Sequence, residues 1–520
     1  VHAYQGEVVS QRVGYELRLA FFEKLQRLSF AYHDRVHSGD LITRGMLDLE
    51  GARVFIQAGL LQGTMLGLLI GVGTYLLLST DLVMGLLALS FVPFAAWRAA
   101  RLGYLLRVTW LRLQELMSTI TLVMEENLQG IRVVRAFSAK AFEVAKFDEA
   151  ATRALALANR RIALRTGGTT AMTLAYFTSM GLLLWVGGHA VIEGRATVGR
   201  LAEYLAFMTI LQTPIRQLTM VVNAMARGTS SGARLFEVLD LEPEVSDRPG
   251  ARPLEATAGV LRFENVDFAY GDDPGAKTAL SGIDFEVGPG RILGIVGPPG
   301  SGKSTIAHLI PRFYNVTGGW VTIDGRDLRD VTLDSLRKAV AVIQQDTFLF
   351  DTTARNNVAY PDPWAAEERI VDAASTARMH DYLAALPQRY ETRVGERGVA
   401  LSGGQRQRLS IARAILADPA VIVFDDSTAA IDAVTERQIR TALREATRHR
   451  TTVIIAHRLS SVVDADEILV LDGGRIVERG THDELLALNG HNRALHDMQA
   501  RAGDTEASRT LVQARAEAVA

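Results

Sequence analysis

The residues with the clearest chemistry lie in a glycine-rich stretch past the middle of the chain. From Gly297 to Thr305 the sequence reads Gly-Pro-Pro-Gly-Ser-Gly-Lys-Ser-Thr, preceded by the apolar run Ile292–Val296 and followed by Ile306–Ile310. Glycines let backbone N–H groups crowd round phosphate oxygens, and the start of a helix adds partial positive charge. A strand, a glycine-rich turn and a helix are the context that a phosphate-binding loop needs, which argues against a chance turn.

Within this loop two side chains have distinct expected parts. Lys303 is expected to reach the β- and γ-phosphates, and the Ser304 hydroxyl to ligate Mg²⁺. ATP and Mg²⁺ are therefore the expected cofactors. The residues assigned to nucleotide binding are Gly297, Pro298, Pro299, Gly300, Ser301, Gly302, Lys303, Ser304 and Thr305.

A second apolar run, Ala420–Phe424, ends in two carboxylates, Asp425 and Asp426. A buried strand that delivers carboxylates at its C-terminal end is the usual companion of a phosphate loop. Asp425 is expected to hold Mg²⁺. Asp426 follows it at the position where a general base could face the water that attacks the γ-phosphate.

A third stretch, Leu401–Gln405, reads Leu-Ser-Gly-Gly-Gln and precedes an apolar helix. Its glycines again offer free backbone N–H groups at a helix start, which predicts a second anion site. One chain cannot wrap both sites round one nucleotide if they are far apart in the fold, whereas two chains that face each other can.

The elements that position these residues begin at about Val260. The pattern there is strand, turn and strand, then the phosphate loop, then alternating helices and strands. This predicts an α/β P-loop NTPase domain that carries an antiparallel subdomain.

The first half of the chain has a different character. Its uncharged runs are expected to cross a bilayer as helices, because the longer ones exceed what a spanning helix requires. The alternative is that these runs form buried helices of a large soluble protein. The length of the first and third runs argues against this alternative, whereas for the fourth run it remains a competing interpretation. The runs are Val54–Thr80, Leu82–Trp97, Thr166–Ile192 and Leu201–Ile215, of which the last is interrupted by Glu203.

Flanking charges predict the topology. Arginines follow the second run and precede the third, so the segment between them is expected to be cytoplasmic, as two helices that turn near Asn127–Gly130. The ATP-binding half is then cytoplasmic, in a multi-pass protein of the plasma membrane, or of the inner membrane in a bacterium. The arginines are Arg98, Arg101, Arg107, Arg160, Arg161 and Arg165.

Composition excludes several classes of function. The formal net charge of the 520 residues is −2, so no large basic face predicts nucleic-acid binding, and the absence of cysteine removes disulfides and thiolate sites. The expected domains are a permease at 1–226, a linker at 227–257, an ATP-binding domain at 258–500 and a flexible tail at 501–520. The chain starts in mid-element, and we expect it to be truncated before Val1.

Taken together, these motifs resemble those of the ATP-binding cassette (ABC) transporters, over nearly the whole chain. The expected fold is an all-α polytopic membrane domain followed by an ABC-type α/β domain. The resemblance implies a role for each of several residues: Tyr270 stacks on adenine, Gln345 senses Mg²⁺ and the membrane domain, Ser402, Gly403, Gly404 and Gln405 clamp the partner's γ-phosphate, Asp432 touches the partner subunit, and His457 contacts the γ-phosphate.

The permease half is similar to that of exporters. Phe30–Gly39 and Gly130–Phe137 resemble coupling segments that lie on the ATPase domains, and Thr392–Gly398 resembles an element typical of exporters. The resemblance implies a half-transporter. Such chains have six spans and this one shows four runs, so two spans are expected before Val1.

One position departs from the family pattern. The catalytic base of the family is Glu, and here it is Asp426. One methylene fewer withdraws the carboxylate by roughly 1 Å, which can cost on the order of a hundredfold in rate. The sequence is similar to the degenerate-site subunits of heterodimeric exporters, and we expect a second half-transporter chain as partner. A homodimer with a slower base is the alternative.

The resulting hypothesis is an ATP-driven exporter subunit that lies in a lipid bilayer. Its expected substrate is a hydrophobic or amphipathic small molecule or a lipid. The alternatives are an ATP-gated channel or regulatory subunit with little turnover, and a soluble ATPase that works on DNA or the ribosome, against which the uncharged runs argue. An importer is disfavoured, since its membrane and ATPase parts are commonly separate chains.

Overall fold

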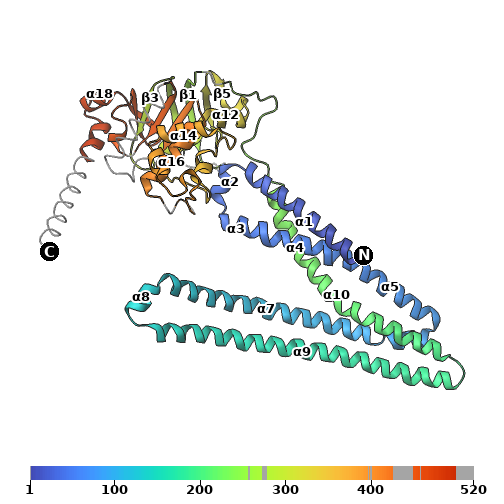
Figure 1. Cartoon of the computed structure of the whole chain (residues 1–520). Helices are drawn as coiled ribbons and strands as arrows, with labels where there is room; N and C mark the ends of the chain where they lie inside the picture. The colour runs from blue at the N-terminus through green and yellow to red at the C-terminus, as the bar shows by residue number, and fades with distance from the viewer. Residues whose placement is uncertain are drawn as a thin grey trace. The chain divides into compact units, whose positions relative to one another are not determined.

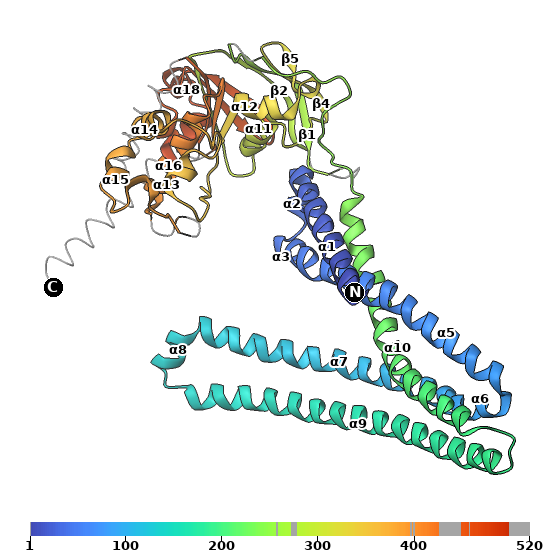
Figure 2. The ribbon, with the colours of Figure 1, turned by 45° about the vertical axis from the view of Figure 1, so that its right-hand side comes forward.

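The computed structural model describes residues 2–255, 258–271, 278–395, 398, 401–425, 449–456 and 458–498; the side chains of residues 2, 3, 213–216, 218 and 219 lie outside that description. Its internal contacts divide the chain into two compact units. The helical unit comprises Val1–Gln26 and His37–Leu241, and the sheet unit comprises Arg27–Val36 and Glu242–Ala520. Figures 1 and 2 show the two kinds of architecture.

The helical unit consists of long helices joined by short turns. Its elements are α1 (His2–Arg27), α3 (Ser38–Thr43), the π-helix η1 (Arg44–Asp48), α4 (Leu49–Val54), the π-helix η2 (Phe55–Gln62), α5 (Gly63–Thr80), α6 (Leu82–Leu89), α7 (Phe91–Gln129), α8 (Ile131–Ala136), α9 (Lys140–Ile192) and α10 (Val198–Leu239). Asp81 separates α5 from α6, and its carboxylate accepts hydrogen bonds from the N–H groups of Val83 and Met84. This cap satisfies donors that a helix start leaves without an intrahelical partner.

Three helical segments of the described residues are long and apolar enough to cross a membrane: Ser38–Thr80, Leu82–Gln129 and Lys140–Ile192. They contain the first three uncharged runs. The fourth run lies in α10, which is not among these segments and whose middle is partly outside the description. The fourth span therefore stays a prediction.

Two boundaries can be compared with the sequence. The helical hairpin expected to turn near Asn127–Gly130 is confirmed, since α7 ends at Gln129 and α9 begins at Lys140 after the short α8. The linker expected at 227–257 differs at its start, because α10 continues to Leu239. Glycine and serine in residues 227–232 suggested a loop, but they lie in α10, where Gly228 and Ser231 serve close helix packing.

That packing joins α4 and η2 to α10. A Cβ on Gly51 would lie 2.5 Å from Ser231 Oγ, and one on Gly228 would lie 2.2 Å from the Phe55 Cβ. Small residues at such crossings let helix backbones approach closely. Asp48, which is 6% exposed, forms an ion pair with Arg234 across the same seam.

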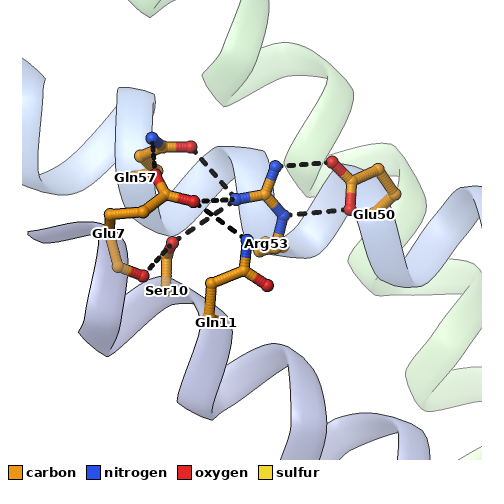
Figure 3. Close-up of polar contacts among 6 residues, drawn as sticks. All are labelled: Glu7, Ser10, Gln11, Glu50, Arg53 and Gln57. Carbon is orange, nitrogen blue, oxygen red and sulfur yellow. Dashed lines mark hydrogen bonds and ion pairs between the residues drawn. The ribbon is translucent and has the colours of Figure 1, made fainter.

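A polar network ties α1 to the same bundle (Figure 3). Arg53 donates two hydrogen bonds to Glu50, at 2.9 and 2.7 Å, and one to Glu7 at 3.2 Å. Gln57 donates to the second oxygen of Glu7. Because its fork is shared among acidic groups of two helices, Arg53 fixes α1 against α4 and η2.

The sheet unit has two sheets. The four-stranded sheet has the order β2-β1-β4-β5 and is antiparallel; the six-stranded sheet has the order β10-β9-β3-β8-β7-β6, in which β9, β3, β8, β7 and β6 are parallel. The strands are β1 (Leu261–Ala269), β2 (Thr278–Val287), β3 (Ile292–Val296), β4 (Gly318–Ile323), β5 (Arg326–Asp327), β6 (Val340–Ile343), β7 (Val421–Asp425), β8 (Thr451–Ile455), β9 (Glu467–Asp472) and β10 (Arg475–Gly480). The expected α/β domain with an antiparallel subdomain is confirmed.

Helices cover these sheets and complete the cores. They are α2 (Phe30–Arg35), α11 (Lys303–Leu309), α12 (Leu333–Ala339), α13 (Ala354–Val358), α14 (Glu367–Thr376), α15 (His380–Ala384), α16 (Gly403–Leu416) and α18 (His482–Ala487), with 3-10 turns η3 (Leu328–Asp330), η4 (Arg389–Glu391) and η6 (Leu459–Ser461). One buried cluster joins β1–β4 to α11, and another joins α13, α14 and α16 to β6 and β7. Ile295 and Ile306, on either side of the phosphate loop, lie in the first cluster, and Leu401 lies in the second.

Candidate nucleotide-binding site

The phosphate loop lies between a central strand and a helix, as its sequence predicts. β3 has parallel neighbours on both sides, β8 and β9, and its residues are almost completely buried. Gly297 and Gly302 are required by their surroundings: a Cβ would lie 2.1 Å from the Leu471 carbonyl oxygen at the first, and 2.7 Å from the Ala279 carbonyl oxygen at the second. At Gly302 φ is +100°, which disfavours any side chain as well.

Lys303 begins α11 and is 4% exposed. Its Nζ donates hydrogen bonds to the carbonyl oxygens of Gly297 and Pro298, each at 2.9 Å. The loop therefore curls round its own ammonium group. A phosphate at this place would meet a positive charge that is already positioned, together with the N–H groups of a helix start.

Ser304 and Asp425 meet although they are far apart in the sequence. The Ser304 hydroxyl donates to Asp425 Oδ1 at 3.1 Å, and Asp425 is 8% exposed at the end of β7. Hydroxyl and carboxylate oxygens are hard ligands of the kind that Mg²⁺ takes alongside nucleotide phosphates. The pair fits the magnesium site that the sequence predicts, and when bound the ion would supply charge neutralisation to the phosphates.

Tyr270 lies at the end of β1, beside the loop. Its hydroxyl lies 3.1 Å from Thr305 Oγ1, and its ring packs edge-on against Phe268 and Tyr314. Burial raises the pKa of Tyr270. The ring remains 45% exposed, which leaves a face for the adenine that it is expected to stack on.

Gln345 follows β6 and is exposed. β6 and β7 are parallel, with Ile343 opposite Phe424. Gln345, just after β6, and Asp425, the last residue of β7, therefore lie at the same edge of the sheet. This placement agrees with a role for Gln345 near the magnesium site.

The stretch Ser402–Gln405 forms a capped helix start. Ser402 Oγ accepts a hydrogen bond from the Gln405 N–H at 3.3 Å, and Gln405 Oε1 accepts one from the Ser402 N–H at 2.8 Å. This capping box orients the first turn of α16, where Gly403 and Gly404 present backbone N–H groups. The predicted anion site thus has the expected local structure.

Several predicted residues lie outside the described part of the chain: Asp426, Asp432 and His457, as well as Glu396 and Arg397 within Thr392–Gly398. The roles assigned to them remain predictions.

The segment α2 packs on the sheet unit, as expected of Phe30–Gly39. Phe30 stacks on Phe313 with ring centroids 3.9 Å apart, and Arg35 forms an ion pair with Glu244 at 2.5 Å. Tyr314 donates its hydroxyl hydrogen bond to Asp34. Burial, and then this contact with Asp34, raise the pKa of Tyr314.

Sequence reasoning missed Tyr314 as part of the nucleotide region. Its ring lies 5.2 Å from that of Tyr270, and both line a cavity of about 560 Å³ that Asp34 and Arg35 also line. An aromatic residue shortly after the phosphate-loop helix is too common to be recognised as a signal. The contact becomes visible only when β1, α11 and α2 are brought together.

The chain resembles known proteins over almost its whole length. Residues 280–429 match the ABC transporter family and residues 1–215 match the ABC transporter transmembrane region. An uncharacterized ABC transporter ATP-binding protein of Bacillus subtilis, YknU, is 36% identical over 508 residues, which cover 96% of this chain and 85% of that protein. An ATP-dependent lipid A-core flippase of Pseudomonas syringae pv. syringae is 38% identical over 504 residues, which cover 94% and 81%.

The fold has a solved counterpart as well. The structure of a bacterial Atm1-family ABC exporter with ATP bound is 32% identical, has a TM-score of 0.79 and covers 95% of this chain and 86% of that one. The two halves of the chain match in the order of an exporter, with the membrane region first. The chain therefore belongs to the ABC transporters, as a transmembrane region fused to an ATPase domain that couples ATP hydrolysis to transport.

Proposed function

We propose that this chain is one subunit of an ATP-driven exporter whose ATP sites form between two chains. One observation supports it most: the Ser304–Asp425 pair beside Lys303 occurs in the same chain as three membrane-length helical segments. A two-chain site is favoured because Ser402–Gln405 forms a second helix start with backbone N–H groups, separate in the sequence from the phosphate loop. Closure of two such domains would then drive the membrane helices between two states.

We propose a heterodimer as the working assembly. The family's catalytic base is a Glu, and this chain has the shorter Asp426 at the matching position. The site built on this phosphate loop would therefore turn over slowly. The capping box at Ser402–Gln405 is intact and can complete a faster site on the partner. An ATP-gated channel or regulatory subunit with little turnover is the second candidate, and the same Asp426 favours it.

Two observations support a hydrophobic or amphipathic substrate: the apolar helices of this chain and the names of its relatives. Residues that would face a bilayer are apolar in α5 and α6. One relative is named a lipid A-core flippase and another a putative multidrug export protein. We propose a hydrophobic or amphipathic small molecule or lipid, moved across the plasma membrane by a protein whose ATPase domain is cytoplasmic.

ATP hydrolysis by the purified chain tests this assignment. The wild-type chain and Asp426→Glu are measured alone and with a candidate partner chain. The slow-site proposal predicts little turnover by the wild type alone and an increase of about tenfold to a hundredfold in Asp426→Glu. Brisk turnover by the wild type alone, unchanged by the substitution, would overturn the proposal of a degenerate site and leave a homodimer.

A further inference from the structure

A cavity of about 640 Å³ lies among α7, α9 and α10 in the helical unit. It is far from the nucleotide residues in the sequence and has no part in their chemistry. Its lining combines aromatic and aliphatic side chains with basic ones. Among the side chains that the structure describes, four arginines and no acidic residue line it: Arg107, Arg161, Arg165 and Arg227.

These arginines differ from others in the same unit. Arg53 and Arg234, for example, form ion pairs with Glu50 and Asp48. For the four arginines of the cavity, no carboxylate in the described part of the chain lies within 4.0 Å. Positive charges gathered beside apolar surface repel one another and are costly to desolvate, so an anion among them would be strongly favoured.

Arg161 has a buried hydrogen-bond donor that an anion could satisfy. Its guanidinium lies over the Trp110 ring, 4.7 Å from the centroid. Its Nε is buried and has no hydrogen-bond partner among the described residues. A buried N–H donor without a partner costs about 1–3 kcal/mol, and an oxyanion that enters the cavity would remove that cost.

The lining also changes character along the helices. Along α7 and α9, Arg107 and Arg161 lie nearer to α8 than Phe91 and Tyr176 do. At about 1.5 Å per residue, Phe91 lies about 24 Å from Arg107 along α7, and Tyr176 lies about 22 Å from Arg161 along α9. The cavity is therefore basic at one end and apolar at the other. Between the two ends it is lined by Leu102, Leu106, Thr169 and Met172.

We propose that this cavity binds an amphipathic molecule with a phosphate or other multiply charged oxyanion as its headgroup. The headgroup lies among the arginines, and its hydrocarbon chain lies along the apolar side towards Phe91 and Tyr176. Arginine is suited to the headgroup because its planar fork pairs with two oxyanion atoms at once. The inference rests on the proposed export function and narrows its substrate class from hydrophobic molecules in general to anionic amphiphiles.

Binding is tested without ATP, on the full chain in phosphatidylcholine nanodiscs. The probe is dansyl-labelled lysophosphatidic acid, excited by energy transfer from tryptophan, with Trp110→Phe identifying the signal from the cavity. The competitors are unlabelled lysophosphatidic acid, lysophosphatidylcholine of the same chain length, and inorganic phosphate. We expect lysophosphatidic acid to compete at least tenfold better than either of the others.

Two variants and a matched control locate the site. Arg161→Gln with Arg165→Gln is expected to weaken binding about tenfold or more, because each removes a charge-assisted contact. Arg160→Gln removes a charge from the residue that precedes Arg161 in α9 and lies outside the lining, and it is expected to change affinity less than twofold. Ala99→Trp fills the cavity without removing charge and is expected to abolish binding. An unchanged far-UV circular dichroism spectrum and thermal unfolding curve show that the helical unit of each variant is folded, and ATP binding shows the same for the sheet unit.

Three results would overturn the proposal. Equal competition by lysophosphatidylcholine would remove the role of the charge, and equal competition by inorganic phosphate would remove the role of the hydrocarbon chain. Absence of binding in a chain that still binds ATP would remove the site. Because ATP is left out, failure here leaves the exporter assignment standing, whereas failure of ATP-driven export leaves this binding result unchanged.

Discussion

The phosphate loop and the arginine-lined cavity hold their positive charges in different ways. Lys303 is held by carbonyl oxygens of its own loop, at 2.9 Å from both Gly297 and Pro298. In the cavity, Arg161 stacks on Trp110, and its Nε has no hydrogen-bond partner in the part of the chain that the structure describes. The first site is organised by its own backbone before a ligand arrives. The second site keeps a hydrogen-bond donor that its own described side chains do not satisfy, and this donor is available to a substrate that binds and is later released.

Removal of the lysine should produce the largest effect. Lys303→Ala takes away a buried charge that is expected to contact the phosphates. The loss of about two charge-assisted contacts should lower ATP affinity by a hundredfold or more. Equilibrium binding of a fluorescent ATP analogue measures it. Lys338→Ala, an exposed lysine that pairs with Asp334 in the same unit, is the control and should bind normally. Unaltered binding in Lys303→Ala would contradict the role of the loop.

Backbone strain offers a second way to test how far the loop is organised in advance. Gly302→Ala places a Cβ 2.6 Å from Leu280 Cδ2 and requires φ near +100°, so it should destabilise the sheet unit by at least about 2 kcal/mol. Gly325→Ala has φ near +73° but open space around it, and should cost about 1 kcal/mol. Thermal unfolding of the full chain, followed by loss of ATP binding, compares them. Equal shifts would mean that close packing behind the loop is unimportant.

The smallest expected effect concerns α2. Tyr314→Phe removes the hydrogen bond to Asp34 while the ring contact with Tyr270 remains. A lost hydrogen bond of about 1 kcal/mol should speed amide exchange in Phe30–Arg35 about three- to tenfold and leave ATP affinity within about twofold.

Tyr390→Phe serves as the matched control for α2. It removes a hydroxyl contact with His380 elsewhere in the sheet unit and should leave the exchange of α2 unchanged. If Tyr314→Phe left the protection of Phe30–Arg35 intact, the hydrogen bond would have no part in holding α2.

The same comparison explains what the sequence could predict. The residues of the phosphate loop are adjacent in the sequence, and the loop is held by contacts among them. Lys303 and Ser304 could therefore be assigned from their positions in the motif alone. Asp425 could be paired with Ser304 because a strand that ends in a carboxylate is a recurring partner of such a loop. The structure agrees with this pairing, since Ser304 Oγ lies 3.1 Å from Asp425 Oδ1.

The cavity could not be predicted in this way. Its arginines come from three helices, and in the sequence Arg107, Arg161 and Arg165 indicated only the cytoplasmic side of the membrane. Their convergence depends on how α7 packs on α9, which no local pattern encodes. The end of α10 was missed for a related reason: Gly228 suggests a loop by composition, but it lies in a helix because Phe55 packs against it.

The most direct test is ATP-dependent movement of lysophosphatidic acid between the leaflets of proteoliposomes that contain the chain with its partner. We predict movement in the wild type, none in a complex in which both phosphate-loop lysines are replaced by Ala, and at least tenfold slower movement at low substrate concentration in Arg161→Gln with Arg165→Gln. Arg160→Gln should match the wild type. ATP-dependent movement that persists without both lysines, or no movement in a wild-type complex that hydrolyses ATP, would contradict the account.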